Sequence, residues 1–142
     1  MRNRFREFTL LNAQISRQLR RIKSEEMADL GLKIGHVSCL YYLYSFGKLT
    51  LAELCELCEE DKANISRSID YMEKNGYLTY LAESDRRYKR PLLLTDKGNV
   101  AAERLMEKID RALAVAGQGI KEEEREIMYD CLAKISANLQ SI

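Results

Sequence analysis

The chain has 142 residues, of which 46% are hydrophobic and 32% are charged, and its formal net charge is +1. This length suits one domain with a core of its own, and the composition excludes a disordered chain. The chain has no apolar run of about 18 residues that would span a membrane, and no apolar stretch with a cleavage site follows its basic N-terminus. We therefore expect a cytoplasmic protein with no membrane partner.

The near-neutral net charge hides an uneven distribution of charged residues. Residues 1–23 contain seven Arg or Lys residues and one acid, Glu7, and residues 85–90 contain four cations beside Asp85. Acidic residues gather at 56–61 and at 122–126. Local basic segments of this kind can bind a polyanion even when the whole chain is neutral.

The first predicted helix covers residues 5–23, where apolar side chains recur at alternating spacings of three and four. This pattern is typical of a coiled-coil seam. Asn12 is the one polar member, and a buried Asn in such a seam tends to fix the register or the number of partners. The seam consists of Phe5, Phe8, Asn12, Ile15, Leu19 and Ile22.

Three shorter helices are expected next. The first covers about 35–46, between glycines that favour helix ends. Thr50 and Glu53 form a capping box that starts the second helix, and Asp61 is a good N-cap for a third helix over 62–75. The inward faces of the second and third helices are predicted to be Leu51, Leu54, Leu57, Cys58, Ile65, Ile69 and Met72.

The helical period then gives way to an extended pattern. Residues 77–81 are aromatic and aliphatic and predict a strand. Residues 91–94 predict a return strand, which Pro91 restricts to an edge or a strand start. Because residues 84–90 between them are polar and mostly cationic, we expect a β-hairpin with a long basic tip.

Two long helices complete the chain. Thr95 and Asp96 are expected to cap the first, over 96–117, and glycines separate it from the second, over 121–140. The residues expected to face inward in the first helix are Val100, Leu105, Met106, Ile109 and Leu113. The second helix repeats the heptad pattern through Met128, Leu132, Ile135, Leu139 and Ile142.

The apolar seams at the two ends of the chain predict a homodimer. They leave more apolar surface than a monomer of this size would bury, and exposed stripes of this kind mark interfaces. The residues predicted to form the dimer interface are Phe5, Phe8, Ile15, Leu19, Met128, Leu132, Ile135 and Leu139.

The middle of the chain has the element order of a helix-turn-helix, whose second helix enters the major groove by its N-terminal half. That half offers an amide, a hydroxyl and two cations: Lys62, Ala63, Asn64, Ser66 and Arg67. Asn can pair with adenine and Arg with guanine, each contributing about 1–3 kcal/mol of discrimination. The basic tip is expected to contact a narrow minor groove through Arg86, Arg87, Lys89 and Arg90, with Asp85 holding one of the two arginines. A solvated helix face and a solubilising hairpin tip are the alternatives.

Four motifs carry a family resemblance: Asn64-Ile65-Ser66-Arg67-Ser68-Ile69, Met72-Glu73-Lys74-Asn75-Gly76-Tyr77, Asp85-Arg86-Arg87 and Leu94-Thr95-Asp96-Lys97-Gly98. On these motifs, residues 61–98 resemble the MarR family of winged helix-turn-helix transcriptional regulators. The order of the predicted helices is similar to that family over the whole chain.

The resemblance implies a mainly α fold with a small β-wing, in a single domain over 1–142. A winged helix-turn-helix core at 35–95 would lie between dimerisation helices at 1–30 and 96–142. The resemblance also implies a dimeric repressor that binds a pseudo-palindromic double-stranded DNA operator. A small-molecule effector, bound in a cleft between the dimerisation helices and the DNA-binding regions, would release the repressor from DNA. Thr79-Tyr80 stand where the family usually places an arginine, so one backbone contact is expected to be missing. Which tip cation enters the groove deepest stays open, because the segment from the wing to Leu94-Thr95 is slightly longer than is usual in the family and contains Pro91.

Two other functions remain open. A winged helix can bind protein instead of DNA, but that role predicts an acidic or apolar recognition face. Cys55 and Cys58 invite a metal or redox interpretation, but no second pair or nearby histidine completes a site, and no catalytic set is visible. We therefore expect no enzyme, cofactor or metal, with reduced cysteines that pack as small apolar side chains and with Cys39 and Cys131 isolated. His36, the one histidine, is expected in a polar role at a helix start.

Overall fold

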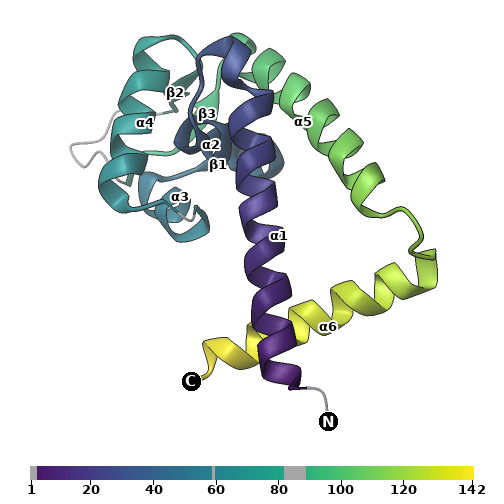
Figure 1. Ribbon diagram of the computed structural model, residues 1–142. Helices are drawn as coiled ribbons and strands as arrows, with labels where there is room; N and C mark the ends of the chain where they lie inside the picture. Colours follow the sequence, from purple (N-terminus) through teal and green to yellow (C-terminus); the bar gives the residue numbers. More distant parts are fainter. Residues whose placement is uncertain (1–2, 59, 82–88) are drawn as a thin grey trace. The chain divides into compact units, whose positions relative to one another are not determined.

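The computed structural model describes residues 3–58, 60–81 and 89–142 (Figure 1). The chain forms two compact units, Met1–Ile109 and Asp110–Ile142. In chain order the elements are α1 (Arg4–Glu26), η1 (Ala28–Leu30), α2 (Ile34–Phe46), β1 (Lys48–Leu49), α3 (Leu51–Leu57), α4 (Lys62–Lys74), β2 (Leu78–Tyr80), β3 (Leu92–Leu94), α5 (Asp96–Ala116) and α6 (Glu122–Gln140). Within the described ranges, no helix combines the length and the apolar character that a membrane span requires.

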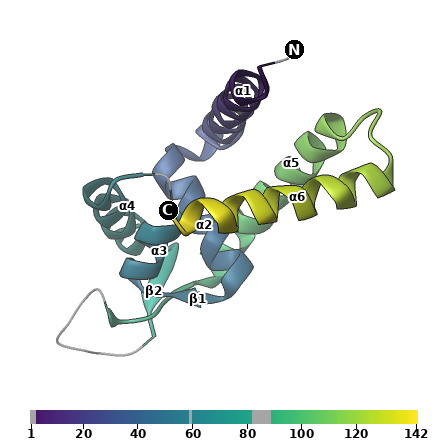
Figure 2. The ribbon, with the colours of Figure 1, turned by 90° about the horizontal axis from the view of Figure 1, so that it is seen from below.

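Helix α2 is the centre of the first unit. It packs against α1, α3, α4 and the strands β1 and β3, as the views in Figures 1 and 2 show. Its buried side chains are His36, Val37, Ser38, Cys39, Leu40 and Leu43. A helix that is buried around most of its circumference needs neighbours on every side, and this explains why the other elements of the unit gather around α2.

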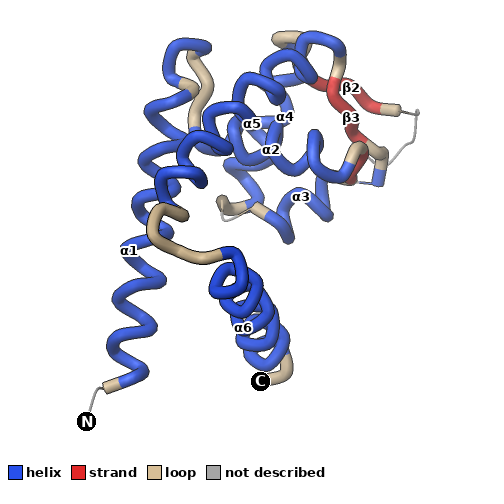
Figure 3. The backbone as a smooth tube through the Cα atoms, turned by 90° about the vertical axis from the view of Figure 1, so that its right-hand side faces the viewer, coloured by secondary structure: helices blue, strands red, loops and turns tan. Residues whose placement is uncertain are grey.

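A small antiparallel sheet contributes to the same core, with strand order β1-β3-β2, and Figure 3 shows β2 and β3 side by side. The hairpin predicted from the sequence is confirmed, with Leu78 paired to Leu94 and Tyr80 paired to Leu92. Strand β1 was not predicted, because its two residues are too few to show a period. It adds a third strand by pairing Lys48 with Leu93.

The junction between α4, β2 and α5 explains two glycines. Gly76 ends α4 with φ +81°, in the left-handed region that favours glycine. At Gly98 an added Cβ would lie 1.9 Å from the backbone oxygen of Tyr77, so only glycine allows α5 to start so close to that residue. The Thr95 hydroxyl donates to the Gly76 carbonyl, and Lys97 Nζ donates to the Asn75 carbonyl at 2.7 Å.

The buried face of α5 differs from the predicted one. Val100 and Leu113 were expected inside, but they are 62% and 50% exposed in the single chain, so this prediction is wrong. Leu105 is buried, as expected, and Ile109 packs against the core. The face that meets the core is Gly98, Ala101, Ala102 and Leu105, because small residues let the helix approach closely.

The second unit consists of the end of α5, a turn and α6. Helix α6 begins with a capping box, in which the Lys121 backbone N–H donates to Glu124 Oε2 at 2.9 Å. Arg125 Nη1 lies 3.3 Å from Glu122 Oε2, one turn along the same helix. None of the α6 residues is buried in the single chain, although the predicted heptad pattern of apolar residues runs along the helix.

Candidate nucleic-acid interface

Helix α4 presents two distinct faces. Ile65, Ile69 and Met72 are fully buried, because their spacing of four and three places them on one side of the helix. Arg67 is exposed on the other side, and Lys62 is exposed at the N-terminal end of the helix. The other predicted base-reading residues also lie outside the core: Ala63 is exposed, and Asn64 and Ser66 are half-buried.

A chain of polar contacts organises the first two turns of α4. The Asp61 carboxylate caps the helix by accepting the Asn64 backbone N–H at 2.7 Å, and the Asn64 side-chain amide donates to the same carboxylate at 3.4 Å. The Arg67 guanidinium donates to the Asn64 side-chain oxygen. The two side chains best suited to read bases are therefore held together, and their orientation depends on the N-cap.

The base of the wing is set by the hairpin ladder. The Leu81 N–H donates to the Pro91 carbonyl at 2.8 Å, beyond the last strand pair. The Arg90 guanidinium lies over the Tyr80 ring, 4.2 Å from its centroid, and Lys89 is exposed. Tyr80 thus supports one predicted wing cation through a cation–π contact. The other predicted wing residues, Asp85, Arg86 and Arg87, lie outside the described residues.

The residues predicted to form the dimer interface are all accessible in the single chain. Those on α1 are Phe5, Phe8, Ile15 and Leu19, with exposed fractions between 39% and 77%. Those on α6 are Met128, Leu132, Ile135 and Leu139, with exposed fractions between 37% and 59%. Apolar side chains left uncovered at regular helical spacing are what an intermolecular seam requires, but the interface itself stays a prediction.

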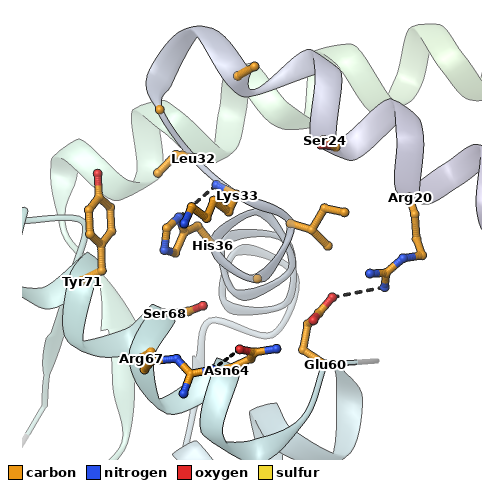
Figure 4. Close-up of a pocket in the computed structure, with 14 residues that line it drawn as sticks. Arg20, Ser24, Leu32, Lys33, His36, Glu60, Asn64, Arg67, Ser68 and Tyr71 are labelled. Carbon is orange, nitrogen blue, oxygen red and sulfur yellow. Dashed lines mark hydrogen bonds and ion pairs between the residues drawn. The ribbon is translucent and has the colours of Figure 1, made fainter.

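A cavity of 770 Å³ lies between α1 and the exposed edge of α4 (Figure 4). Its described lining includes Arg20 of α1, Lys33 and His36 at the start of α2, and Asn64, Arg67 and Tyr71 of α4. Three of the charged lining residues are cations, and Glu60 is the one carboxylate among them. The cavity therefore suits a small anion better than a cation.

His36 joins the first turn of α2 to α4 at the edge of this cavity. Its Nδ1 accepts the Lys33 backbone N–H at 3.0 Å, which confirms the polar role predicted at a helix start. Its ring stacks on Tyr71, with centroids 4.4 Å apart and planes 14° apart. Burial, followed by the nearby charge of Lys33, lowers the pKa of His36 below its usual 6.5, so the neutral imidazole is favoured.

The cysteines are arranged differently from the prediction in one respect. Cys39 was expected to be isolated, but its thiol contacts that of Cys58 in the core, and this hydrogen bond, with burial, raises the pKa of Cys39 well above its usual value. Burial also raises the pKa of Cys55. All four cysteines are free. In the described part of the chain, no group of three His, Cys, Asp or Glu side chains is arranged to hold a metal ion.

Sequence reasoning missed the cavity and the contacts that shape it. From the sequence, Arg20 belonged only to the basic segment 1–23 and Glu60 only to the acidic cluster at 56–61. In the structure Arg20 Nη1 lies 3.1 Å from Glu60 Oε1. The two residues are 40 positions apart, so no local pattern in the sequence signals the pair.

Comparison with known proteins agrees with this geometry. The MarR family model matches residues 30–87, from the end of η1 to beyond β2. An uncharacterized HTH-type transcriptional regulator of Bacillus subtilis strain 168, YybA, is 25% identical over 89% of this chain and 84% of its own length.

Two solved structures share the fold. One is a protein from Listeria monocytogenes assigned to the MarR family and complexed with a 26mer DNA, with a TM-score of 0.81 and 24% identity over 98% of this chain and 90% of the other. The second is Staphylococcus aureus MarR in complex with salicylate and kanamycin, with a TM-score of 0.80 and 17% identity over 96% of this chain and 92% of the other. In its family model, its named relatives and its winged fold, the chain is similar to the MarR family of helix-turn-helix transcriptional regulators.

Proposed function

We propose that this protein is a dimeric DNA-binding transcriptional regulator that reads a pseudo-palindromic operator through α4 of each subunit. The observation that carries the proposal is the division of α4 into two faces. Ile65 and Ile69 are fully buried and anchor the helix, whereas Lys62 and Arg67 stay exposed near its N-terminus. A major-groove helix needs buried residues that hold it rigidly and exposed residues in its first turns that reach base edges.

The similar fold of the Listeria monocytogenes protein with its 26mer DNA supports a role in DNA binding. In this proposal the wing follows the adjacent minor groove through the predicted contacts Arg86, Arg87, Lys89 and Arg90, of which Lys89 and Arg90 lie within the described residues. Such a role also requires the cytoplasmic location that the sequence predicts, since the operator lies on the chromosome.

The exposed seams on α1 and α6 support the homodimer in this proposal. Two-fold symmetry would present two copies of α4 to half-sites about one helical turn apart, which requires a pseudo-palindromic operator. The division of the chain into a reading core at 35–95 and dimerisation helices at 1–30 and 96–142 is part of the same proposal.

The cavity between α1 and α4 is the proposed effector site, and its ligand would release a repressor from DNA. An anion that enters it meets Arg20, Lys33 and Arg67, and an aromatic ring meets the stacked His36 and Tyr71. The Staphylococcus aureus MarR complex with salicylate supports a small aromatic carboxylate as the first probe. Salicylate added to the protein–DNA complex is expected to lower the bound fraction.

DNA binding is tested by selecting bound duplexes from a random pool and measuring their mobility shift at increasing salt. We expect a pseudo-palindromic sequence, with an affinity that falls steeply with salt because phosphate contacts release counterions. Arg67→Ala should relax base preference at one position of each half-site, at a cost of about 1–3 kcal/mol. Arg111→Ala, which removes an exposed cation of α5 far along the chain, is the matched control and should bind like wild type. Selection that yields no salt-sensitive shift would overturn the proposal.

A further inference from the structure

One ion pair crosses from α1 to the residue that precedes the N-cap of α4. Arg20 Nη1 lies 3.1 Å from Glu60 Oε1, and Figure 4 shows the two side chains meeting at the edge of the cavity. The Glu60 side chain is only 15% exposed, whereas that of Arg20 is 44% exposed. A carboxylate so far removed from solvent depends on its partner more than a surface carboxylate does.

Glu60 is coupled directly to the start of α4. The next residue, Asp61, is the N-cap, whose carboxylate accepts the Asn64 N–H at 2.7 Å and whose carbonyl accepts the Ile65 N–H at 3.0 Å. A displacement of Glu60 therefore moves the cap and, through it, the turn that carries Asn64 and Arg67. The ion pair acts on the part of α4 that would contact bases.

Beside the cavity, direct packing of side chains does not set the distance between α1 and α4. The cavity of 770 Å³ separates Arg20 and Ser24 on α1 from Asn64 and Arg67 on α4. Where side chains interdigitate, the separation of two helices is determined by packing. Where a cavity intervenes, a bridging contact at its edge has more influence on that separation, and the Arg20–Glu60 pair is such a contact.

We propose that the Arg20–Glu60 pair is a positioning device that fixes α4 relative to α1, and thereby sets the half-site spacing that the dimer accepts. The inference rests on the proposed function, in which α1 forms part of the dimer interface. Arg20 directly follows Leu19, a member of the α1 seam, so one end of the ion pair is tied to the helix at the dimer axis. The other end is tied to the N-cap of the helix that enters the groove.

The test uses the operator selected by the wild-type protein and a series of duplexes whose half-sites are moved apart or together by one and two base pairs. Binding to each duplex is measured for wild type, Arg20→Ala, the isosteric Glu60→Gln and the double charge exchange Arg20→Glu with Glu60→Arg. Wild type should prefer one spacing. In each single variant, the ratio of the affinity for the preferred spacing to the affinity for the other spacings should fall about fivefold. The charge exchange should restore most of this ratio.

Arg21→Ala is the matched control. Arg21 is the next residue on α1, and its partner, Glu25, lies on the same helix at 3.1 Å, so its loss should leave the spacing preference unchanged. Thermal melts of every variant separate positioning from stability, because a variant that is merely less stable loses affinity equally at all spacings. The conservative Arg20→Lys keeps the charge and should retain a larger part of the preference than Arg20→Ala.

Two results would overturn the inference while leaving the proposed function intact. One is a wild-type spacing preference that Arg20→Ala and Glu60→Gln both retain in full. The other is a loss of preference in the single variants that the folded charge-exchange variant does not repair. If the wild-type protein selects no duplex at all, the proposed function itself fails, and the inference fails with it.

Discussion

Helices α1 and α4 have similar patterns of apolar residues, but these side chains are exposed in α1 and buried in α4. In α4, Ile65 and Ile69 are fully buried within the chain, whereas in α1, Ile15 and Leu19 are 58% and 43% exposed. The same spacing of three and four residues thus produces an apolar face that the chain itself buries in α4 and leaves exposed to solvent in α1. Helical periodicity identifies a face that needs a partner, but it does not say whether that partner belongs to the same chain.

The difference follows from position in the fold. Helix α4 lies against α2, the central helix, and against α3 and β2, which together cover its apolar face. Helix α1 also contacts α2, but its side chains from Phe5 to Leu19 remain accessible. The comparison predicts that α4 contributes to the stability of the fold and α1 to association, and matched substitutions can separate the two effects.

The largest effect is expected from Ile69→Ala. Ile69 is fully buried, and truncating such a side chain removes apolar contacts and leaves a cavity, which costs about 2–5 kcal/mol of unfolding free energy. Urea denaturation followed by circular dichroism measures this loss. Glu73→Ala, at an exposed position of the same helix, is the control and should change the free energy by less than about 0.5 kcal/mol. Equal effects at the two positions would contradict the buried face assigned to α4.

The same substitution at Ile15 should act on association instead. Ile15 is 58% exposed in the single chain, so its truncation creates no cavity there. At a two-fold interface the change occurs twice, and we expect the dimer dissociation constant to rise at least about tenfold, or about 1.4 kcal/mol. Sedimentation velocity over a range of concentrations measures this shift. A wild-type protein that sediments as a monomer at micromolar concentration would remove the dimer from the proposal.

Much of this fold was predictable because its signals are local. The capping box of Thr50 and Glu53 is confirmed at the start of α3, and the Asp61 cap is confirmed at the start of α4. The hairpin was predicted because the helical spacing of apolar residues gives way to an extended pattern between Tyr77 and Leu94. Each of these signals lies within a few residues of the element that it specifies.

The features that were missed depend on contacts between distant segments. The Arg20–Glu60 pair, the stacking of His36 on Tyr71 and the contact of the Cys39 and Cys58 thiols each join two helices or a helix and a turn. The buried face of α5 was misjudged for a related reason. Val100 is the larger apolar residue, but Ala101 and Ala102 face the core, because close helix packing there favours small side chains over large ones.

A smaller effect is expected at the cap of α4. Asp61→Ala removes the carboxylate that accepts the Asn64 N–H at 2.7 Å and should cost about 1 kcal/mol of unfolding free energy. Because the same carboxylate orients Asn64, DNA affinity should fall by more than stability alone explains. Asp61→Asn keeps a capping oxygen and should recover most of the stability. If Asp61→Ala and Asp61→Asn are equally destabilised in urea titrations, the cap is not what holds this turn.

The smallest effect concerns pH and the contact between α2 and α4. The lowered pKa of His36 means that the unfolded chain, with its usual pKa of 6.5, binds a proton more readily than the folded protein does. The stability that the neutral ring contributes is therefore complete above pH 6.5 and is lost as the pH falls below 6.5 toward the folded pKa. Protonation of Nδ1 would also abolish the hydrogen bond that it accepts from the Lys33 N–H.

His36→Gln tests this dependence, since a glutamine at the third helical position can still accept that N–H but does not titrate. His36 is the one histidine of the chain, so no other imidazole contributes between pH 5 and 7. Unfolding free energies measured across this range should fall with acidification more steeply in wild type than in His36→Gln. Parallel curves for the two proteins would mean that burial against Tyr71 does not oppose protonation of the ring, and that the α2–α4 contact is insensitive to pH.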